Sequence, residues 1–367
     1  MTDIKDRSMT KAKPPANQNN YRLIFPRRNR RGAAAPLATA LCMISAFLSP
    51  LSTQKAKAAT VYWDEDTTAL NDSAATGGSG LGQASTANIL WDTTSNAWWN
   101  GTSMVDQAWN NSNNDTAAFW GTAGSVSLGS VITVGGLLFN TTAYTISTGA
   151  NTLTFAAGSD NITLNNSGTA APTTAMTQTI TGAVGGSGSV TFTGGVLGGI
   201  VGNTLTFNGT SITGWTGATT INNNQTISLA ANSQALVSTS GITLNGGGIT
   251  LTNTTLAEAA LNRVKDTAAI TSNGGLITVT NTVAAATPYS ETIGAITLSS
   301  GRLNINQVNA NTGGTQVLQL SGLTPSGTGS VAIFGGGGLN TTTNRVNNSA
   351  FGSATTAGQI KIGRAHV

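Results

Sequence analysis

One alternating tetrapeptide, present in three evenly spaced copies, decides the fold: Thr204-Leu-Thr-Phe207, Thr226-Ile-Ser-Leu229 and Gly248-Ile-Thr-Leu251. In a β-strand this alternation places the apolar residues on one face and the small polar residues on the other. The first apolar residues, Leu205, Ile227 and Ile249, follow one another at a constant interval. A period of roughly 20 to 30 with such short strands is typical of a solenoid, whose coils bury their apolar residues only by stacking. We therefore predict an all-β fold, a right-handed parallel β-helix (β-solenoid), with these three residues on one inward ladder.

The same pattern continues along most of the chain. Turn residues such as Asn-Gly, Gly-Gly and Asn-Asn separate the copies. The interval from Ile296 to Leu318 equals that from Leu205 to Ile227, which favours the same period near the C-terminus. An antiparallel β-sandwich is the alternative, but it favours hairpins and does not explain a recurring spacing. The further copies are Thr152–Phe155, Asn161–Leu164, Ser189–Phe192, Gly241–Leu244, Leu276–Val279, Ala295–Leu298, Arg302–Ile305, Val317–Leu320 and Ser330–Ile333.

The stretch from Val61 to Phe139 has a different, tryptophan-rich sequence pattern. Short motifs follow one another there in a fixed order: Trp63-Asp64, the Gly-rich turn 76–82, Trp91-Asp92, the stretch 115–124 with its Gly-Thr-Ala-Gly, Gly136-Leu-Leu-Phe139 and Tyr144-Thr-Ile146. This order resembles the autotransporter-associated β-strand repeat, with good correspondence from Tyr62 to Leu164. The resemblance implies the passenger part of an autotransporter, or a related large surface protein.

Six of the seven tryptophans lie in this first part of the chain. A solenoid must cover its exposed last coil, and large aromatic side chains do this well. We expect these residues to form a cap; a carbohydrate-stacking platform is the alternative, and it requires coplanar exposed indoles. The predicted cap residues are Trp63, Trp91, Trp98, Trp99, Trp109, Trp120 and Phe119.

Four segments follow from these patterns. Residues 1–58 are predicted to be a signal peptide, with a basic region ending at Arg31, an apolar run and the cleavage site Ala56-Lys-Ala58. Residues 59–124 are the Trp-rich N-terminal cap region, and residues 125–360 are the passenger-like solenoid body. Residues 361–367 resemble a translated sequencing adapter, so we expect that His366 is foreign and that the natural reading frame continues past Gln359.

Charge and composition narrow the function. Residues 59–360 contain four basic and eleven acidic residues, a net charge of −7, which argues against nucleic acid as a partner. They contain neither cysteine nor histidine, which excludes disulfides, Ser-His-Asp and Cys-His catalysis, and ordinary zinc sites.

The acidic residues are the remaining candidates for chemistry. Asp64, Glu65, Asp66 and Asp72 could bind calcium, but no EF-hand or β-roll calcium motif is present, so a solvated acidic turn is favoured. Asp160 is the only charged residue between positions 124 and 250, and we expect it to be exposed on a turn, without a role. We therefore predict no catalytic, cofactor-binding or metal-binding residues and no cofactor.

One segment departs from the strand pattern. Leu256–Lys265 is rich in helix formers, with Leu256, Ala260 and Val264 on one helical face. We expect a short helix or loop that protrudes between coils and is decorative.

Together these observations predict an exported, non-catalytic structural or adhesin-like protein at the cell surface or outside the cell. A polysaccharide-binding or polysaccharide-degrading β-helix protein is the alternative. The expected partners are a cell surface, extracellular matrix or polysaccharide, and the outer membrane through a C-terminal region beyond this chain.

Overall fold

The computed structural model describes residues 58–348, apart from 76, 85–87, 166–174, 195–201, 210–213, 259–260, 284–287, 310–313, 338 and 340–342. All of these residues belong to one compact unit, Lys55–Val367. Except for Ala58, the predicted signal peptide lies outside the described residues, as does the C-terminal adapter-like segment. Among the described residues, no helix is long and apolar enough to cross a membrane.

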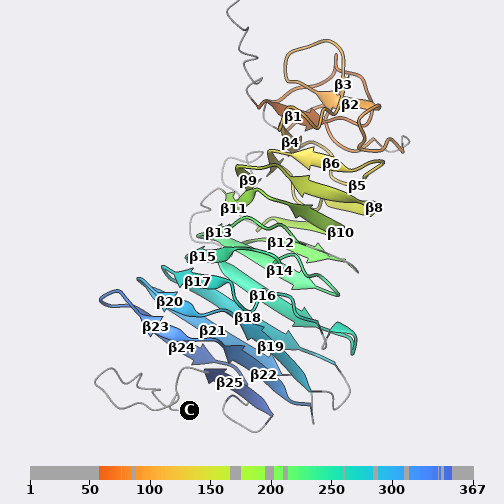
Figure 1. Ribbon diagram of the computed structural model, residues 1–367. Helices are drawn as coiled ribbons and strands as arrows, with labels where there is room; N and C mark the ends of the chain where they lie inside the picture. The colour runs from red at the N-terminus through yellow and green to blue at the C-terminus, as the bar shows by residue number, and fades with distance from the viewer. Residues whose placement is uncertain are drawn as a thin grey trace, which may run out of the picture. The chain divides into compact units, whose positions relative to one another are not determined.

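The described chain is a β-solenoid built of stacked parallel strands (Figure 1). Its largest sheet has twelve strands in the order β23-β20-β17-β15-β13-β11-β9-β7-β4-β1-β2-β3. These strands are β1 (Thr60–Trp63), β2 (Asn96–Trp99), β3 (Gln107–Ala108), β4 (Thr116–Phe119), β7 (Gly136–Phe139), β9 (Ser159–Leu164), β11 (Ser189–Gly194), β13 (Thr219–Asn222), β15 (Gly241–Asn245), β17 (Ala269–Ser272), β20 (Ile296–Leu298) and β23 (Leu323–Pro325).

The second sheet has ten strands, with β24-β21-β18-β16-β14-β12-β10-β8-β5 in order and β6 beside β8. Successive coils therefore contribute one strand to each of the two large sheets. The strands of the second sheet are β5 (Ser125–Ser127), β6 (Ile132–Val134), β8 (Thr145–Phe155), β10 (Thr177–Gly186), β12 (Asn203–Asn208), β14 (Gln225–Ala230), β16 (Gly248–Asn253), β18 (Gly275–Asn281), β21 (Arg302–Asn309) and β24 (Val331–Gly335).

A third sheet, in the order β19-β22-β25, is present only in the last described coils. There each coil has three strands, for example β17, β18 and β19 in succession. The third sheet consists of β19 (Tyr289–Ile293), β22 (Gln316–Leu320) and β25 (Asn344–Asn348).

The predicted inward ladder is confirmed. Leu205 pairs with Ile227, and Ile227 pairs with Ile249, all in parallel register and all at most 2% exposed. The ladder continues to Ile277 and Ile305. The antiparallel sandwich is therefore wrong for the body, while the handedness of the coil stays a prediction.

The interval from Ile296 to Leu318 does not reflect the coil. Ile296 pairs with Leu323, whereas Leu318 lies in the third sheet beside Glu291. Our interpretation of this spacing was wrong because the two residues lie in different sheets and the later coils are longer. The ladder shows the longer coils, since Ile277 follows Ile249 at a longer interval than Ile249 follows Ile227, although all three occupy the same position in successive coils. This lengthening begins before β19, the first strand of the third sheet.

The segment Leu256–Lys265 also differs from the prediction. Leu256 is 55% exposed, and the chain then turns inward, so that Val264 is buried and forms a parallel bridge with the buried Leu236. Glu258 and Arg263 are buried as well. The segment is therefore not a decorative protrusion: it completes the wall of the coil.

The N-terminal end of the stack is closed by antiparallel strands. β1 pairs in parallel with β4 but antiparallel with β2, and β2 pairs antiparallel with β3. The edge of the sheet is then the two-residue strand β3, which offers another chain little to extend. The first part of the chain thus acts as a cap, as its aromatic content predicts.

Candidate functional site

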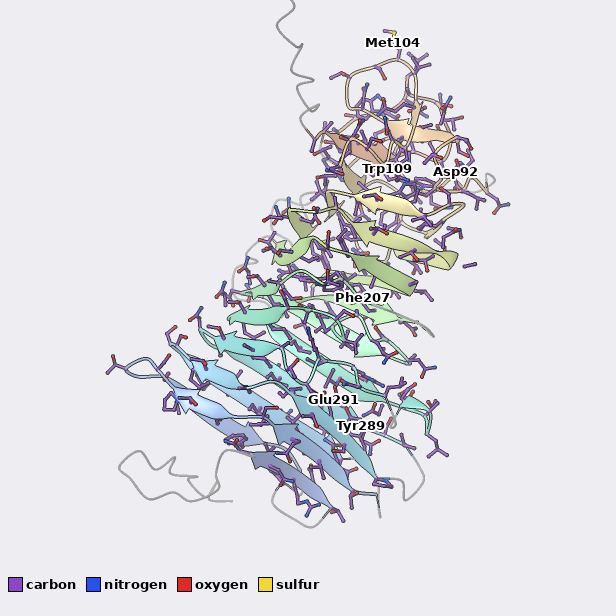
Figure 2. The ribbon with its side chains drawn as sticks, in the orientation of Figure 1. Asp92, Met104, Trp109, Phe207, Tyr289 and Glu291 are labelled. Atoms are coloured by element: carbon purple, nitrogen blue, oxygen red, sulfur yellow. The ribbon has the colours of Figure 1, made fainter. Side chains whose placement is uncertain are left out.

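The tryptophans of the cap are packed against one another in its interior. The Trp98 ring lies 5.4 Å from Trp63, 4.9 Å from Trp91 and 4.8 Å from Trp109 between centroids. Trp109 lies inside the cap, whereas Met104 projects at its far end (Figure 2). None of the six indoles is more than 8% exposed, so the carbohydrate-stacking platform is wrong.

The repeat motifs touch one another across the cap. Adding a Cβ to Gly121, which has a positive φ of 66°, would place it 1.9 Å from the carbonyl oxygen of Leu81 in the Gly-rich turn. The hydroxyl of Tyr144 donates to the carbonyls of Trp120 and Thr122, the latter at 2.8 Å. The Gly-rich turn, the Gly-Thr-Ala-Gly stretch and the following tyrosine are therefore one packing unit, which explains their order in the sequence.

Three acidic side chains of the cap meet in space: Asp64, Asp72 and Asp106. Asp64 directly follows β1, Asp72 lies in the next loop, and Asp106 directly precedes β3. One carboxylate oxygen from each lies within 4.8 Å of the others. Asp106 was missed in the sequence because it lies far from Asp64 and Asp72 along the chain, at no motif spacing.

The environment of this cluster disfavours charge. Burial, and then repulsion from Asp72, Asp66 and Asp106, raises the pKa of Asp64 to about 8. Burial and the same kind of repulsion raise the pKa of Asp72 to about 6. The pKa of Asp106 is raised as well, mainly by burial.

The other two acids of the predicted group have separate positions. Asp66 is exposed and orders the loop, because its carboxylate accepts from the Thr68 amide at 2.8 Å and from the Asn71 side chain at 3.1 Å. Glu65 is 1% exposed, and burial raises its pKa. The expected solvated acidic turn is therefore wrong for Asp64 and Glu65, which are both buried.

Asp160 is not an exposed turn residue either. It lies in β9 with 3% exposure, at the inward position that Val190 and Thr219 occupy in the next two coils. One of its carboxylate oxygens, Oδ2, is buried without a hydrogen-bond partner. Burial raises the pKa of Asp160 to about 7. The prediction failed because the alternation Asp160-Asn-Ile162 turns the acid to the same side as the isoleucine.

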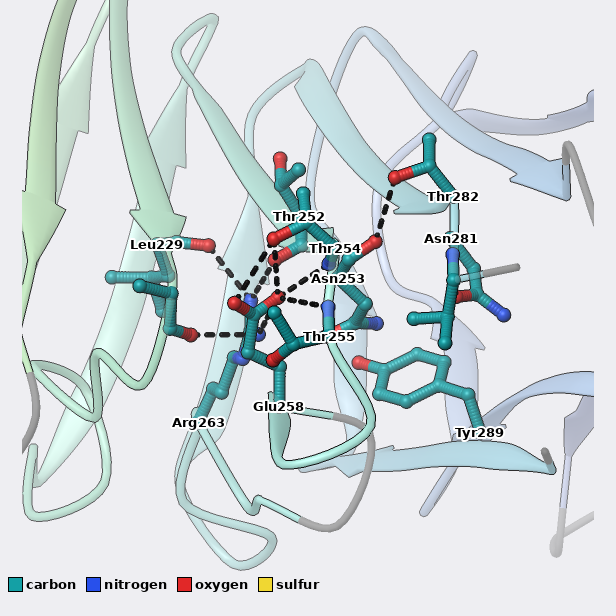
Figure 3. Close-up of polar contacts among 12 residues, drawn as sticks. Leu229, Thr252, Asn253, Thr254, Thr255, Glu258, Arg263, Asn281, Thr282 and Tyr289 are labelled. Atoms are coloured by element: carbon teal, nitrogen blue, oxygen red, sulfur yellow. Dashed lines mark hydrogen bonds and ion pairs between the residues drawn. The ribbon is translucent and has the colours of Figure 1, made fainter. Parts of the chain in front are cut away.

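The body contains a buried charged network around Arg263 (Figure 3). Its guanidinium donates to the carbonyls of Leu229, Thr252 and Ala231 at 2.6–2.9 Å and lies 3.7 Å from the carboxylate of Glu258. These carbonyls lie at or just after the C-terminal ends of β14 and β16. The arginine therefore supplies donors to backbone groups near the point where the strand ladders end.

Glu291 is the second acid of this network. Its Oε1 accepts from the amides of Arg263 and Val264 at 3.0 Å each. Burial nevertheless raises its pKa to about 7. Glu291 and the neighbouring Tyr289 lie within the body rather than on its surface (Figure 2), so this network has a structural role.

The outer faces of the body carry rows of small uncharged polar side chains. In the twelve-stranded sheet, the parallel register aligns one threonine from each of six successive strands. In the ten-stranded sheet it aligns one residue from each of six strands, which is a threonine or serine in five of them and an asparagine in the sixth. The first row is Thr191, Thr220, Thr243, Thr271, Thr297 and Thr324. The second row is Thr179, Thr206, Ser228, Thr250, Thr278 and Asn306.

The comparisons with known proteins agree with the resemblance noted in the sequence. Over 158 residues, 42% of this chain, the sequence is 37% identical to the adhesin BmaC autotransporter of Brucella suis biovar 1 (strain 1330). The chain spans 4% of the length of that protein. No family model matches the chain, and no solved structure matches it. The chain thus resembles part of an autotransporter adhesin.

Proposed function

We propose that this protein is an exported surface adhesin of the autotransporter passenger type, which acts by binding and not by catalysis. The similarity to the BmaC adhesin carries the proposal. The β-solenoid fits this role, because stacked coils present an extended surface built from nearest-neighbour contacts. The expected partner is a cell surface or extracellular matrix, and anchoring to the outer membrane through a region beyond this chain belongs to the same proposal.

The character of the outer rows supports binding over acid-base chemistry. Four of the charged residues of the described body, Asp160, Glu258, Arg263 and Glu291, are buried. The rows themselves offer hydroxyls and amides, which donate and accept hydrogen bonds without a pKa near neutrality. A flat array of this kind suits recognition of other hydrogen-bonding surfaces, and it supplies no general acid or base.

The test is an adhesion assay with the full chain. Beads coated with the purified protein are expected to bind cultured epithelial cells or immobilised matrix proteins more than uncoated beads do. Replacing Thr220, Thr243 and Thr271 together with lysine should reduce binding, whereas the same change at the exposed cap residues Thr93, Thr94 and Thr102 should not. Equal binding by coated and uncoated beads would contradict the proposal. Release of reducing sugars from a polysaccharide panel would replace it with an enzymatic function.

A further inference from the structure

The acidic cluster of the cap has a property that a solvated acidic turn lacks. Both carboxylate oxygens of Asp72 and of Asp106, together with Oδ2 of Asp64, are shielded from solvent and lack a hydrogen bond of good geometry. Asp64 itself is 0% exposed, and its other oxygen accepts from the Asp66 amide at 3.1 Å. The cluster therefore contains five shielded carboxylate oxygens without a well-formed hydrogen bond. Buried acceptors in folded proteins rarely lack a hydrogen bond.

The described part of the cap contains no basic residue to neutralise these acids. Residues 58–262 contain no lysine, arginine or histidine. Among the described residues the ion pair that forms is Arg263 with Glu258, in the body. Uncompensated carboxylates in a buried site are costly, so the cluster must take up either protons or a cation from solution.

From these observations we infer that Asp64, Asp72 and Asp106 form a calcium-binding site in the cap. The ligand type fits a hard cation, since all the donors are carboxylate oxygens and none is nitrogen or sulfur. Oxygens within 4.8 Å of one another can surround one ion at the calcium–oxygen distance of about 2.4 Å. Magnesium bonds at about 2.1 Å, and its octahedral geometry demands a tighter group.

Calcium at this site would bind to two loops that are far apart in the sequence and hold them together. One loop runs from Asp64 to Asp72, and the other precedes β3 at Asp106. Both carry strongly exposed apolar residues, Leu70 at 75% and Met104 at 78% exposure, which are also chymotrypsin-type cleavage points. Ion binding should therefore slow cleavage at these two positions. The inference goes beyond the proposed adhesion and does not depend on it.

Thermal melting of the full chain tests the site directly. In calcium at one hundred times its dissociation constant, the melting temperature is expected to rise by about 4 °C, and a chelator should reverse the rise. Terbium, used as a calcium substitute, should show emission sensitised by Trp63, the residue before Asp64, and calcium should displace it. Cleavage at Leu70 and Met104 should slow in parallel.

Matched variants separate a ligand role from a packing role. Asp72→Asn and Asp106→Asn should lose the calcium-induced rise, yet in chelator they should melt at or above the wild-type temperature, because each removes a repelling acid. Asp92→Asn is the control, since the carboxylate of this cap residue accepts its hydrogen bonds from Thr94 and Ser95 in its own turn, and this variant should keep the full rise. These variants decide the question even if Asp64→Asn does not fold.

The result that overturns the inference is also specific. If calcium does not change the melting temperature and terbium shows no sensitised emission, the inference is wrong and protons neutralise the cluster. A calcium-induced rise retained in both Asp72→Asn and Asp106→Asn would place the ion elsewhere, and a rise with magnesium but not calcium would refute the choice of ion.

Discussion

Replacing Ile227 with alanine tests whether stability resides in the stacked ladders. Ile227 is 0% exposed and lies between Leu205 and Ile249 in the neighbouring coils. The substitution removes three buried carbons, which contribute about 0.8 kcal/mol each, or about 2.4 kcal/mol together. A cavity term adds to this loss, because backbone hydrogen bonds hold the strands about 4.8 Å apart and prevent the ladder from closing. We expect the free energy of unfolding to fall by about 3–4 kcal/mol.

The assay is urea unfolding of the full chain, followed by circular dichroism. Ser228→Ala is the matched control, because Ser228 is the next residue of the same strand and belongs to an outward row. That change should alter the free energy of unfolding by no more than about 0.5 kcal/mol. Ile227→Val should give an intermediate loss of about 1 kcal/mol. Equal losses for Ile227→Ala and Ser228→Ala would refute the ladder.

Double variants test whether each coil is stabilised mainly by the coils next to it. Ile227 touches the coil of Ile249, whereas Ile305 is three strands away, about 14 Å at the usual strand spacing. Alanine at Ile227 and Ile249 should therefore give a combined loss that differs from the sum by at least about 0.5 kcal/mol, while Ile227 and Ile305 should be additive.

Three further changes probe the buried polar groups. Burial raises the pKa of Asp160 to about 7, so its contribution to stability is present at pH 4 and is lost as the pH rises through 7. The Asp160→Asn variant should therefore unfold at the same urea concentration as the wild type at pH 4, and at a higher urea concentration than the wild type at pH 8. Arg263→Met removes the donor to three carbonyls and the ion-pair partner of Glu258, whose carboxylate keeps its hydrogen bonds from Thr254 and Thr255. It should cost about 3–5 kcal/mol in urea unfolding, against about 0.5 kcal/mol or less for the less buried Lys265→Met. Tyr144→Phe removes a hydroxyl that donates to the carbonyls of Trp120 and Thr122. It should lower the free energy of unfolding by about 1–3 kcal/mol, seen as a melting temperature lower by a few degrees. An unchanged melting temperature would show that the cap motifs are not coupled.

The sequence predicts the strands that carry two apolar residues in alternation, because that pattern is sufficient to bury one face. All twelve predicted copies lie in or overlap strands of the body. β13 (Thr219–Asn222) and β17 (Ala269–Ser272) were not predicted, since each has a single isoleucine among polar or small residues. Their strand conformation comes from pairing with the coils on both sides, which no local pattern reports.

The positions of the charged residues could not be predicted in the same way. The general rule that charged side chains are exposed fails for Asp160, Arg263 and Glu291. The partners of Arg263 are backbone carbonyls that are distant along the chain, and they come together only when the coils stack. The same holds for Asp106, whose role depends on two loops that meet in the cap.

These buried acids show three different solutions to one electrostatic problem. Glu291 receives two backbone amides and lies near Arg263, so the protein itself provides its partners. Asp160 is a single buried acid beside Val190 of the next coil, and one proton is enough to neutralise it. The cap cluster has five shielded oxygens without a well-formed hydrogen bond, no basic residue follows it before Arg263, and its three acids repel one another. Calcium should therefore stabilise the cap alone, whereas a shift from pH 8 to pH 5 should stabilise the cap and the coil of Asp160 together.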